Sequence, residues 1–203
     1  MARKVAFIDR DQPSAADNAF DINGVASLIE NLSTESGRRF VDLVSGAPAL
    51  LLFLRHAGCT FCREALADVA NARKQIEAGG TRIVLVHMGD RRAIGSLLTK
   101  YGLEDLERVC DPSQTLYRTF GLKRGRMLQL FGLKVWWRGF VAGVVKGHGI
   151  GKASADARQM PGVFLVDQGM IAKHFRHNSA ADRPEYTAIC RLLKPKWQTT
   201  TVH

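Results

Sequence analysis

Two cysteines three positions apart, Cys59 and Cys62, have the clearest capacity for chemistry in this chain. They lie between an apolar run that ends at Leu54 and an amphipathic segment that begins at Arg63. A cysteine at the start of a helix meets unpaired N–H groups and the positive end of the helix dipole, which stabilise a thiolate. We therefore expect Cys59 to be a nucleophile. Cys62 lies one helical turn further on, where its sulfur can displace a mixed disulfide formed at Cys59.

The same residues allow two other interpretations. Free cysteine is among the most buried residue types, so the pair could be structural. His56, Cys59 and Cys62 also have the spacing of metal ligands, and Cys110 could supply a fourth donor. The sequence contains no second Cys-x-x-Cys and no His-x-x-x-His pair. The pattern therefore favours redox chemistry, and we expect no metal.

Basic residues flank the cysteine pair. Arg55 and His56 precede it, where a cation would favour the thiolate and an imidazole could move protons near neutral pH. Arg63, in the first helical turn, would face the same site. The alternative for these residues is that they belong to an ordinary solvated loop. The remaining thiols, Cys110 and Cys190, lie in apolar segments and are expected to belong to the core.

The segments around the pair alternate between buried strands and amphipathic helices. Residues 49–54 form a continuous apolar run, as expected for a strand buried on both faces. Residues 63–78 place their apolar side chains on one stripe, which predicts a helix. Next come a strand at 83–88, a helix after Asp90, a short strand at 109–110 and a short helix at 113–120 capped by Ser113. This order predicts a parallel sheet with helices on its faces.

A hairpin and a final helix complete the pattern. Residues 163–166 and 171–175 predict two short strands, joined by a turn that contains glycine for a positive φ. Asp182 is predicted to cap the last helix. Parallel strands followed by an antiparallel pair give the order of the thioredoxin fold. We therefore predict an α/β protein with a central mixed sheet flanked by helices.

Length and composition indicate one domain with additions at both ends. The 203 residues, 46% hydrophobic, suffice for one α/β domain with a full core and are too few for two. We expect an N-terminal extension at 1–47, with a short helix near Phe40, a redox domain at 48–195 and a tail at 196–203. The first residues lack the sustained apolar stretch of a secretory signal, so we expect a cytoplasmic protein.

Most of the net charge of +10 comes from an insertion at residues 123–158. This segment holds eight Lys and Arg residues and a single acidic residue, Asp156. Its large apolar side chains recur at helical spacing: Leu133, Trp136, Trp137, Phe140, Val141 and Val144. Cations interrupt the stripe, which argues against a membrane span. We expect the insertion to fold back beside the thiol site and to bind neither a membrane nor nucleic acid.

Three of these segments resemble one family. They are residues 49–64, the Cys-Asp-Pro-Ser of residues 110–113 and residues 159–167. The chain is similar, over roughly residues 45–193, to the peroxiredoxin-like branch of the alkyl hydroperoxide reductase and thiol-specific antioxidant (AhpC/TSA) superfamily. Redoxins related to selenoprotein L resemble it most, and prostamide/prostaglandin F synthase-like proteins resemble it less.

The resemblance implies roles for particular residues. Cys59 and Cys62 match the redox pair of the family, and Pro161 matches the cis-proline that faces this pair. Met160, before the proline, would offer a backbone edge to a peptide or thiol substrate. The resemblance further implies a thiol-dependent oxidoreductase without a bound cofactor, recharged by a thioredoxin- or glutathione-type thiol.

The chain also departs from the pattern of peroxiredoxins. In their Pro-x-x-x-Thr-x-x-Cys motif, Leu52 replaces the proline and His56 the threonine, and Pro161 occupies the place of an arginine that polarises peroxide. These departures favour thiol-disulfide exchange with a protein or small-molecule disulfide. The alternatives are a thiol-dependent peroxidase or carbonyl reductase of peroxiredoxin-like type, and a non-catalytic module that binds metal or protein.

Overall fold

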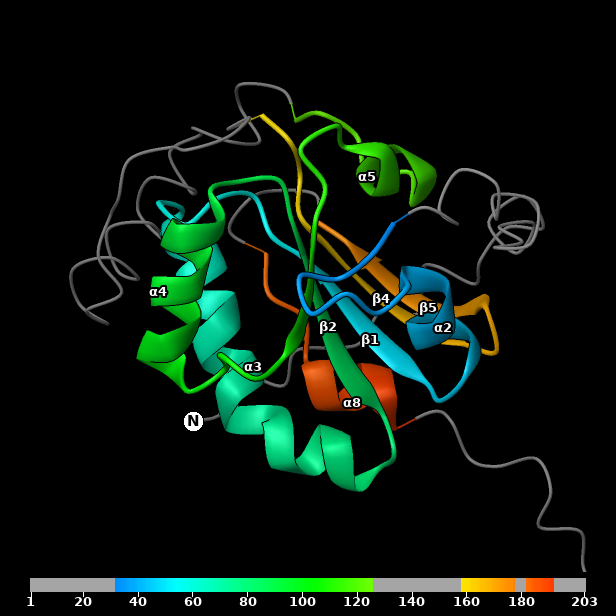
Figure 1. The fold of residues 1–203 in the computed structure, drawn as a ribbon. Coiled ribbons are helices and arrows are strands. Elements are labelled where there is room, and N and C mark those ends of the chain that lie inside the picture. The colour runs from blue at the N-terminus through cyan, green and yellow to red at the C-terminus, as the bar shows by residue number, and fades with distance from the viewer. Residues whose placement is uncertain (1–31, 126–157, 178–181, 192–203) are drawn as a thin grey trace, which may run out of the picture.

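A computed structural model describes residues 32–125, 158–177 and 182–191 (Figure 1). Its centre is a five-stranded sheet in the order β3-β2-β1-β4-β5. The strands are β1 (Ala49–Phe53), β2 (Arg82–His87), β3 (Glu107–Cys110), β4 (Gly162–Asp167) and β5 (Met170–Arg176). β1, β2 and β3 run parallel, whereas β4 is antiparallel to both β1 and β5. The predicted mixed sheet is confirmed.

Helices cover both faces of this sheet (Figure 1). On one face are α3 (Thr60–Ala78), α4 (Arg91–Tyr101) and α8 (Tyr186–Cys190). On the other are α2 (Phe40–Ser45) and α5 (Thr115–Thr119). The predicted order of helices is also confirmed. Within the described ranges, no helix combines the length and the apolar character needed to cross a bilayer.

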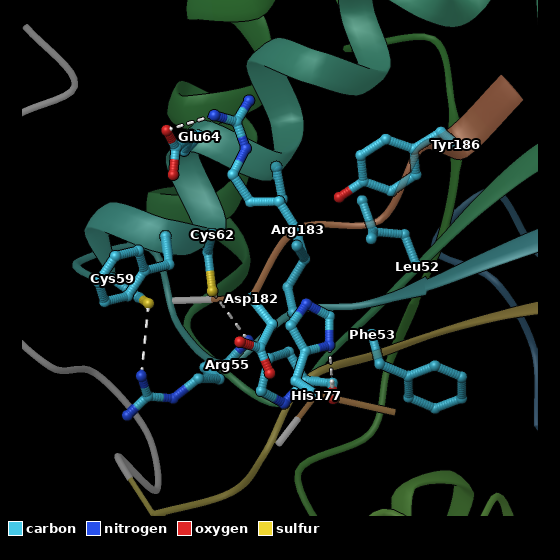
Figure 2. Close-up of a pocket in the computed structure, with 14 residues that line it drawn as sticks. Leu52, Phe53, Arg55, Cys59, Cys62, Glu64, His177, Asp182, Arg183 and Tyr186 are labelled. Atoms are coloured by element: carbon cyan, nitrogen blue, oxygen red, sulfur yellow. Dashed lines mark hydrogen bonds and ion pairs between the residues drawn. The ribbon is translucent and has the colours of Figure 1, made fainter. Parts of the chain in front are cut away.

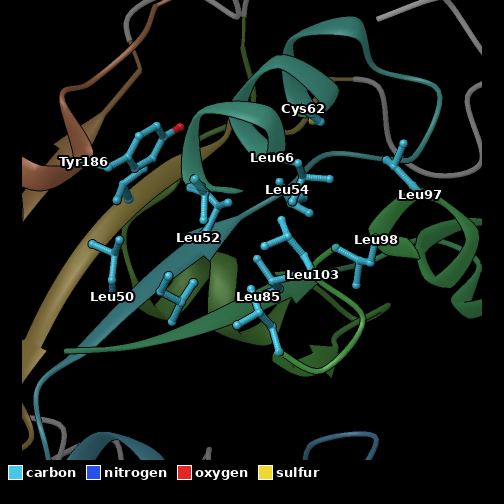
Figure 3. Packing of buried hydrophobic residues seen from close by; sticks show 14 of the residues in the cluster. Leu50, Leu52, Leu54, Cys62, Leu66, Leu85, Leu97, Leu98, Leu103 and Tyr186 are labelled. Carbon is cyan, nitrogen blue, oxygen red and sulfur yellow. The ribbon is translucent and has the colours of Figure 1, made fainter. Parts of the chain in front are cut away.

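β1 divides the core into two layers. Leu50 and Leu52 pack toward α3, α4 and α8 (Figure 3), whereas Leu51 and Phe53 pack toward α2 and α5. Every residue of β1 is buried. Because burial of a large apolar side chain stabilises the fold by about 1.5–3 kcal/mol, a strand enclosed on both faces favours a continuous apolar run.

The turn between β4 and β5 agrees with its prediction. Gln168 and Gly169 have φ angles of 50° and 75°. Two consecutive residues with positive φ are characteristic of the type I′ turn, whose twist matches that of the flanking strands. Glycine adopts this conformation without steric cost.

The start of α5 (N-cap Gln114) differs from its prediction, because the side-chain hydrogen bonds to its first turn come from Asp111 and not from Ser113. The Asp111 carboxylate accepts hydrogen bonds from the N–H groups of Thr115 at 3.0 Å and Leu116 at 2.8 Å. The Ser113 hydroxyl donates to the same carboxylate at 2.9 Å. A carboxylate is the stronger acceptor at a helix N-terminus, since it carries a full negative charge.

The other predicted cap is also wrong. The N-cap of α8 is Glu185, without a side-chain capping bond, so Asp182 lies ahead of the helix. Residues 182–185 form a non-helical segment ahead of α8. The predicted insertion lies outside the described residues except for positions 123–125 and 158, as do the tail and most of the N-terminal extension.

Candidate functional site

The cysteine pair lies where the chain leaves β1 and enters α3. Cys59 is the N-cap of α3, and Cys62 lies in its first turn. The Cys59 N–H donates to the His56 carbonyl at 3.0 Å, which tightens the turn before the helix. Both cysteines are free thiols, with 6% and 3% of their surface exposed. The predicted strand-to-helix placement is therefore confirmed.

Arg55 contacts both sulfur atoms (Figure 2). Its backbone N–H donates to Cys62 Sγ at 3.2 Å, and its Nη1 donates to Cys59 Sγ at 3.6 Å. The arginine is itself buried. A guanidinium charge this close to a sulfur shielded from water favours the thiolate strongly.

The two thiols have opposite pKa shifts. The hydrogen bond from Cys62 is the largest influence on Cys59, and together with the charge of Arg55 it outweighs burial and lowers the pKa of Cys59 to about 6. The same hydrogen bond and burial raise the pKa of Cys62 well above its usual value. At neutral pH this arrangement favours a Cys59 thiolate that accepts a hydrogen bond from a protonated Cys62.

His56 and Arg63 flank the cysteine pair in the chain, and their role in tuning the thiol site stays a prediction. Burial, followed by the charges of Arg55 and Arg63, lowers the pKa of His56 to about 4. A pKa this low favours a neutral imidazole near pH 7, which argues against His56 as a cation beside the thiol pair. Arg63 donates from Nε to the Ala57 carbonyl at 2.9 Å, a contact that braces the loop before the helix.

Pro161 lies beside the pair, but its peptide bond is trans. It lines the same pocket as Cys59 and Cys62, as the resemblance implied. The described backbone contains no cis peptide bond, so the predicted cis-proline is wrong. The trans form is the intrinsically preferred state of a bond that precedes proline.

The backbone of Met160 is engaged within the chain. Its N–H donates to the Lys123 carbonyl at 3.2 Å, and its carbonyl accepts from Gln159 Nε2 at 3.3 Å. The bridge between Arg124 and Gln159 holds this segment in place. Met160 therefore does not present the backbone edge that we expected a substrate to use.

A pocket opens between the start of α3, the end of β1 and the segment before α8 (Figure 2). Its apolar lining comprises Leu52, Phe53, Leu54, Phe61, Ala65, Pro161 and Tyr186. Its polar lining comprises Arg55, Cys59, Cys62, Glu64, His177, Asp182 and Arg183. The sequence analysis identified the first three of these polar residues as candidates and missed the last four.

Arg183 fastens the segment before α8 to α3. It donates from Nη1 to Glu64 at 2.9 Å and from Nε to Asp68 at 3.0 Å. Glu64 is only 2% exposed, so its pairing with Arg183 offsets part of the cost of burying a carboxylate. These contacts join residues that are 119 and 115 positions apart in the sequence. The sequence feature that could have indicated them is the i, i+4 spacing of Glu64 and Asp68, which places both carboxylates on one face of the helix.

His177 follows β5 and reaches the same pocket. Its Nδ1–H donates to the Pro161 carbonyl at 3.1 Å. Burial, the largest influence, lowers the pKa of His177 to about 4, although the nearby Asp182 acts in the opposite direction. A neutral imidazole therefore lines the pocket that also contains the thiol pair.

A thiol pair at the start of the helix that follows the central strand of a mixed sheet defines a thioredoxin-like redox protein. Residues 68–180 match the family model described as AhpC/TSA antioxidant enzyme, and the chain belongs to this family. It is accordingly a peroxiredoxin-like, thiol-dependent oxidoreductase. The match begins after Cys62, so family membership does not by itself assign the two cysteines.

Individual relatives agree with this classification. The chain is 27% identical over 175 residues to the prostamide/prostaglandin F synthase of Danio rerio, covering 83% of this chain and 85% of the relative. Among solved structures, peroxiredoxin Q of Xanthomonas campestris has a TM-score of 0.52 at 16% identity, covering 75% of this chain and 83% of the other. Peroxidoxin BcpB of Mycobacterium tuberculosis has a TM-score of 0.53 at 19% identity, covering 80% and 92%. These structures support the fold.

Proposed function

We propose that the protein is a thiol-disulfide oxidoreductase in which Cys59 attacks and Cys62 resolves. The Cys59 thiolate attacks one sulfur of a substrate disulfide, the substrate S–S bond breaks, and the other substrate sulfur leaves as a thiolate. Cys62 then loses its proton and attacks Cys59 Sγ, which releases the second substrate thiol. Two electrons pass to the substrate, and the protein is left with a Cys59–Cys62 disulfide.

The opposite pKa shifts of the two thiols carry this proposal. A pKa of about 6 makes Cys59 a thiolate at neutral pH, whereas the raised pKa of Cys62 keeps it protonated until a mixed disulfide has formed. Once Cys59 is bound in that disulfide, it no longer carries the negative charge that keeps Cys62 protonated. The order of attack then follows from the electrostatics of the pair.

The cycle needs an external thiol and no bound cofactor, because both electrons travel through sulfur. We propose a thioredoxin- or glutathione-type reductant, and a protein or small-molecule disulfide as oxidant. Such a cycle requires surroundings that keep thiols reduced, for which the cytoplasm is the natural setting.

A second candidate function, reduction of a peroxide or carbonyl, is favoured by the contact between Arg55 and Cys59. Peroxiredoxin-like chemistry needs a cation beside the attacking sulfur, and the guanidinium of Arg55 lies 3.6 Å from Cys59 Sγ although Pro161 replaces the arginine of the motif. The hydroxyl of the motif is still replaced by His56. This second candidate draws on the similarity to prostamide/prostaglandin F synthase, a relative named for a synthase activity and not for disulfide exchange.

Trapping the intermediate tests the proposed order of attack. In Cys62→Ser, a substrate disulfide should leave a stable adduct on Cys59, detectable by mass spectrometry of the intact protein and its peptides. The matched variant Cys59→Ser should form no adduct under the same conditions. An adduct on Cys62 in that variant, formed as fast as the one on Cys59, would reverse the assignment.

Stopped-flow kinetics separate the two candidate functions. The unmodified reduced protein should react much faster with a small disulfide than with hydrogen peroxide, because it lacks the threonine of the peroxiredoxin motif. A peroxide reaction faster than the disulfide reaction, and dependent on Cys59, would replace the proposed function by the second candidate.

A further inference from the structure

A second group of reactive side chains lies at the ends of β2 and β3, outside the pocket of the cysteine pair. His87 is the last residue of β2 and Cys110 the last of β3, and the two are direct partners in the parallel ladder. Glu35, from the segment before α2, reaches the same place. The sequence analysis considered Cys110 as a donor beside the cysteine pair, but the structure places it with Glu35 and His87 instead.

The donor atoms of these three residues converge. One carboxylate oxygen, one imidazole nitrogen and the Cys110 sulfur all lie within 4.8 Å of one another. Within this group, His87 Nε2 and Glu35 Oε1 are 3.1 Å apart. The imidazole is fully buried, so its orientation is fixed by the surrounding core. Cys110 is half-buried, and its thiol makes a long contact of 3.8 Å to the Gly89 carbonyl.

We propose that Glu35, His87 and Cys110 bind a divalent transition-metal ion, with zinc as the best match. Thiolate, imidazole and carboxylate are the three side-chain donors that zinc uses in proteins, and three protein ligands leave a fourth position open. Calcium and magnesium, which prefer oxygen ligands, fit this set poorly.

Two arginines at Glu35 are compatible with a bound cation. Arg108 donates from Nε to Oε2 at 2.5 Å, and therefore occupies the carboxylate oxygen that does not face His87. A hydrogen-bonded second oxygen is a common way to orient a ligating carboxylate. Arg91 lies 3.7 Å from Oε1, but its side chain is 67% exposed and can turn into solvent. The carboxylate and a thiolate would offset most of the charge that the ion adds.

Cobalt(II) provides the test, because a cobalt–thiolate bond has a charge-transfer absorption that other ligands do not produce. The full-length protein carrying Cys59→Ser and Cys62→Ser retains two cysteines, Cys110 and Cys190. Titration of this reduced protein with cobalt should produce the thiolate band and saturate at a single site, and zinc should remove the band. The background variant also separates this proposal from the proposed redox function, which requires the substituted cysteines.

Further substitutions in the same background identify the ligands. Cys110→Ser should abolish the band, and the matched control Cys190→Ser should retain it. His87→Gln and Glu35→Gln should each weaken cobalt binding by at least the ~10–100-fold that loss of a supporting residue around a metal site costs. Circular dichroism identifies any variant that fails to fold. If His87→Gln or Glu35→Gln does not fold, the affinity of the remaining folded variant decides. Absence of the band in the background variant, its survival in Cys110→Ser, or unchanged affinity in a folded His87→Gln or Glu35→Gln would overturn the proposal.

Discussion

Replacing Arg55 by methionine should raise the pKa of Cys59 and leave the cysteine pair in place. Methionine fills a similar volume without the charge, and the backbone N–H of residue 55 can still donate to Cys62 Sγ. Two unit charges at the observed 3.6 Å interact by on the order of 4–5 kcal/mol at an effective dielectric constant of about 20. This is an upper bound, because the charge of a guanidinium is spread over several atoms.

Measured effects of one opposite charge at such distances are about 1–3 pKa units. The pKa of Cys59, about 6 in the unaltered protein, should therefore rise to about 7–9 in Arg55→Met. The hydrogen bond from Cys62 remains in this variant and prevents a larger rise. At neutral pH the variant should thus lose much of its thiolate.

The assay is the pH dependence of alkylation at Cys59 by a small reagent, with the labelled peptide quantified by mass spectrometry. The thiolate is the reacting form, so the rate should rise with pH and level off above the pKa. Arg63→Met is the matched control, because that guanidinium is bound to the Ala57 carbonyl. The control should keep the midpoint near that of the unaltered protein. Equal midpoints in Arg55→Met and the unaltered protein would refute the assignment of Arg55 as the cation of the site.

Further predictions concern stability. Because the pKa of His177 is lowered from 6.5 to about 4, the folded protein binds a proton there more weakly than the unfolded chain. The stabilisation that comes from the neutral form of His177 is complete above about pH 6.5 and is lost as the pH falls toward 4. The free energy of unfolding, measured by urea titration, should therefore decline less steeply over this pH range in His177→Gln than in the unaltered protein. Asp111→Ala should lower the free energy of unfolding by about 0.5–2 kcal/mol through loss of the α5 cap, and Ser113→Ala should lower it less. Equal losses in the last two variants would contradict the capping geometry.

The parts of the fold that follow from local patterns could be predicted from the sequence. The continuous apolar run of β1 reflects burial on both faces, and the stripe of α3 reflects burial on one. The positions of Cys59 and Cys62 follow from the same patterns, because the pair lies between a strand and a helix that each have a clear signature. For these residues, the segments adjacent in sequence determine which secondary-structure element each residue occupies.

Features that depend on distant partners could not be predicted. The sequence analysis predicted Ser113 as the cap of α5, and only the three-dimensional path of the loop shows that the Asp111 carboxylate faces the helix N-terminus instead. The resemblance implied that the Met160 backbone is available to a substrate, but its N–H is bonded to the carbonyl of Lys123, which lies 37 positions earlier at the start of the insertion. A histidine at position 56 could move protons near neutral pH, as the sequence suggests. Burial, followed by the charges of Arg55 and Arg63, lowers its pKa to about 4, and this environment could not be predicted from the sequence.

The geometry of the parallel strands explains why both groups of reactive residues lie at one edge of the sheet. β1, β2 and β3 are parallel, so their carboxyl ends share an edge, and the helices that follow begin there. Cys59 follows the first of these strands, His87 ends the second and Cys110 ends the third. The fold thus places two thiols in similar topological positions. Their neighbours then separate their chemistry, since Arg55 favours a free thiolate at Cys59, whereas an imidazole and a carboxylate beside Cys110 favour a shared cation.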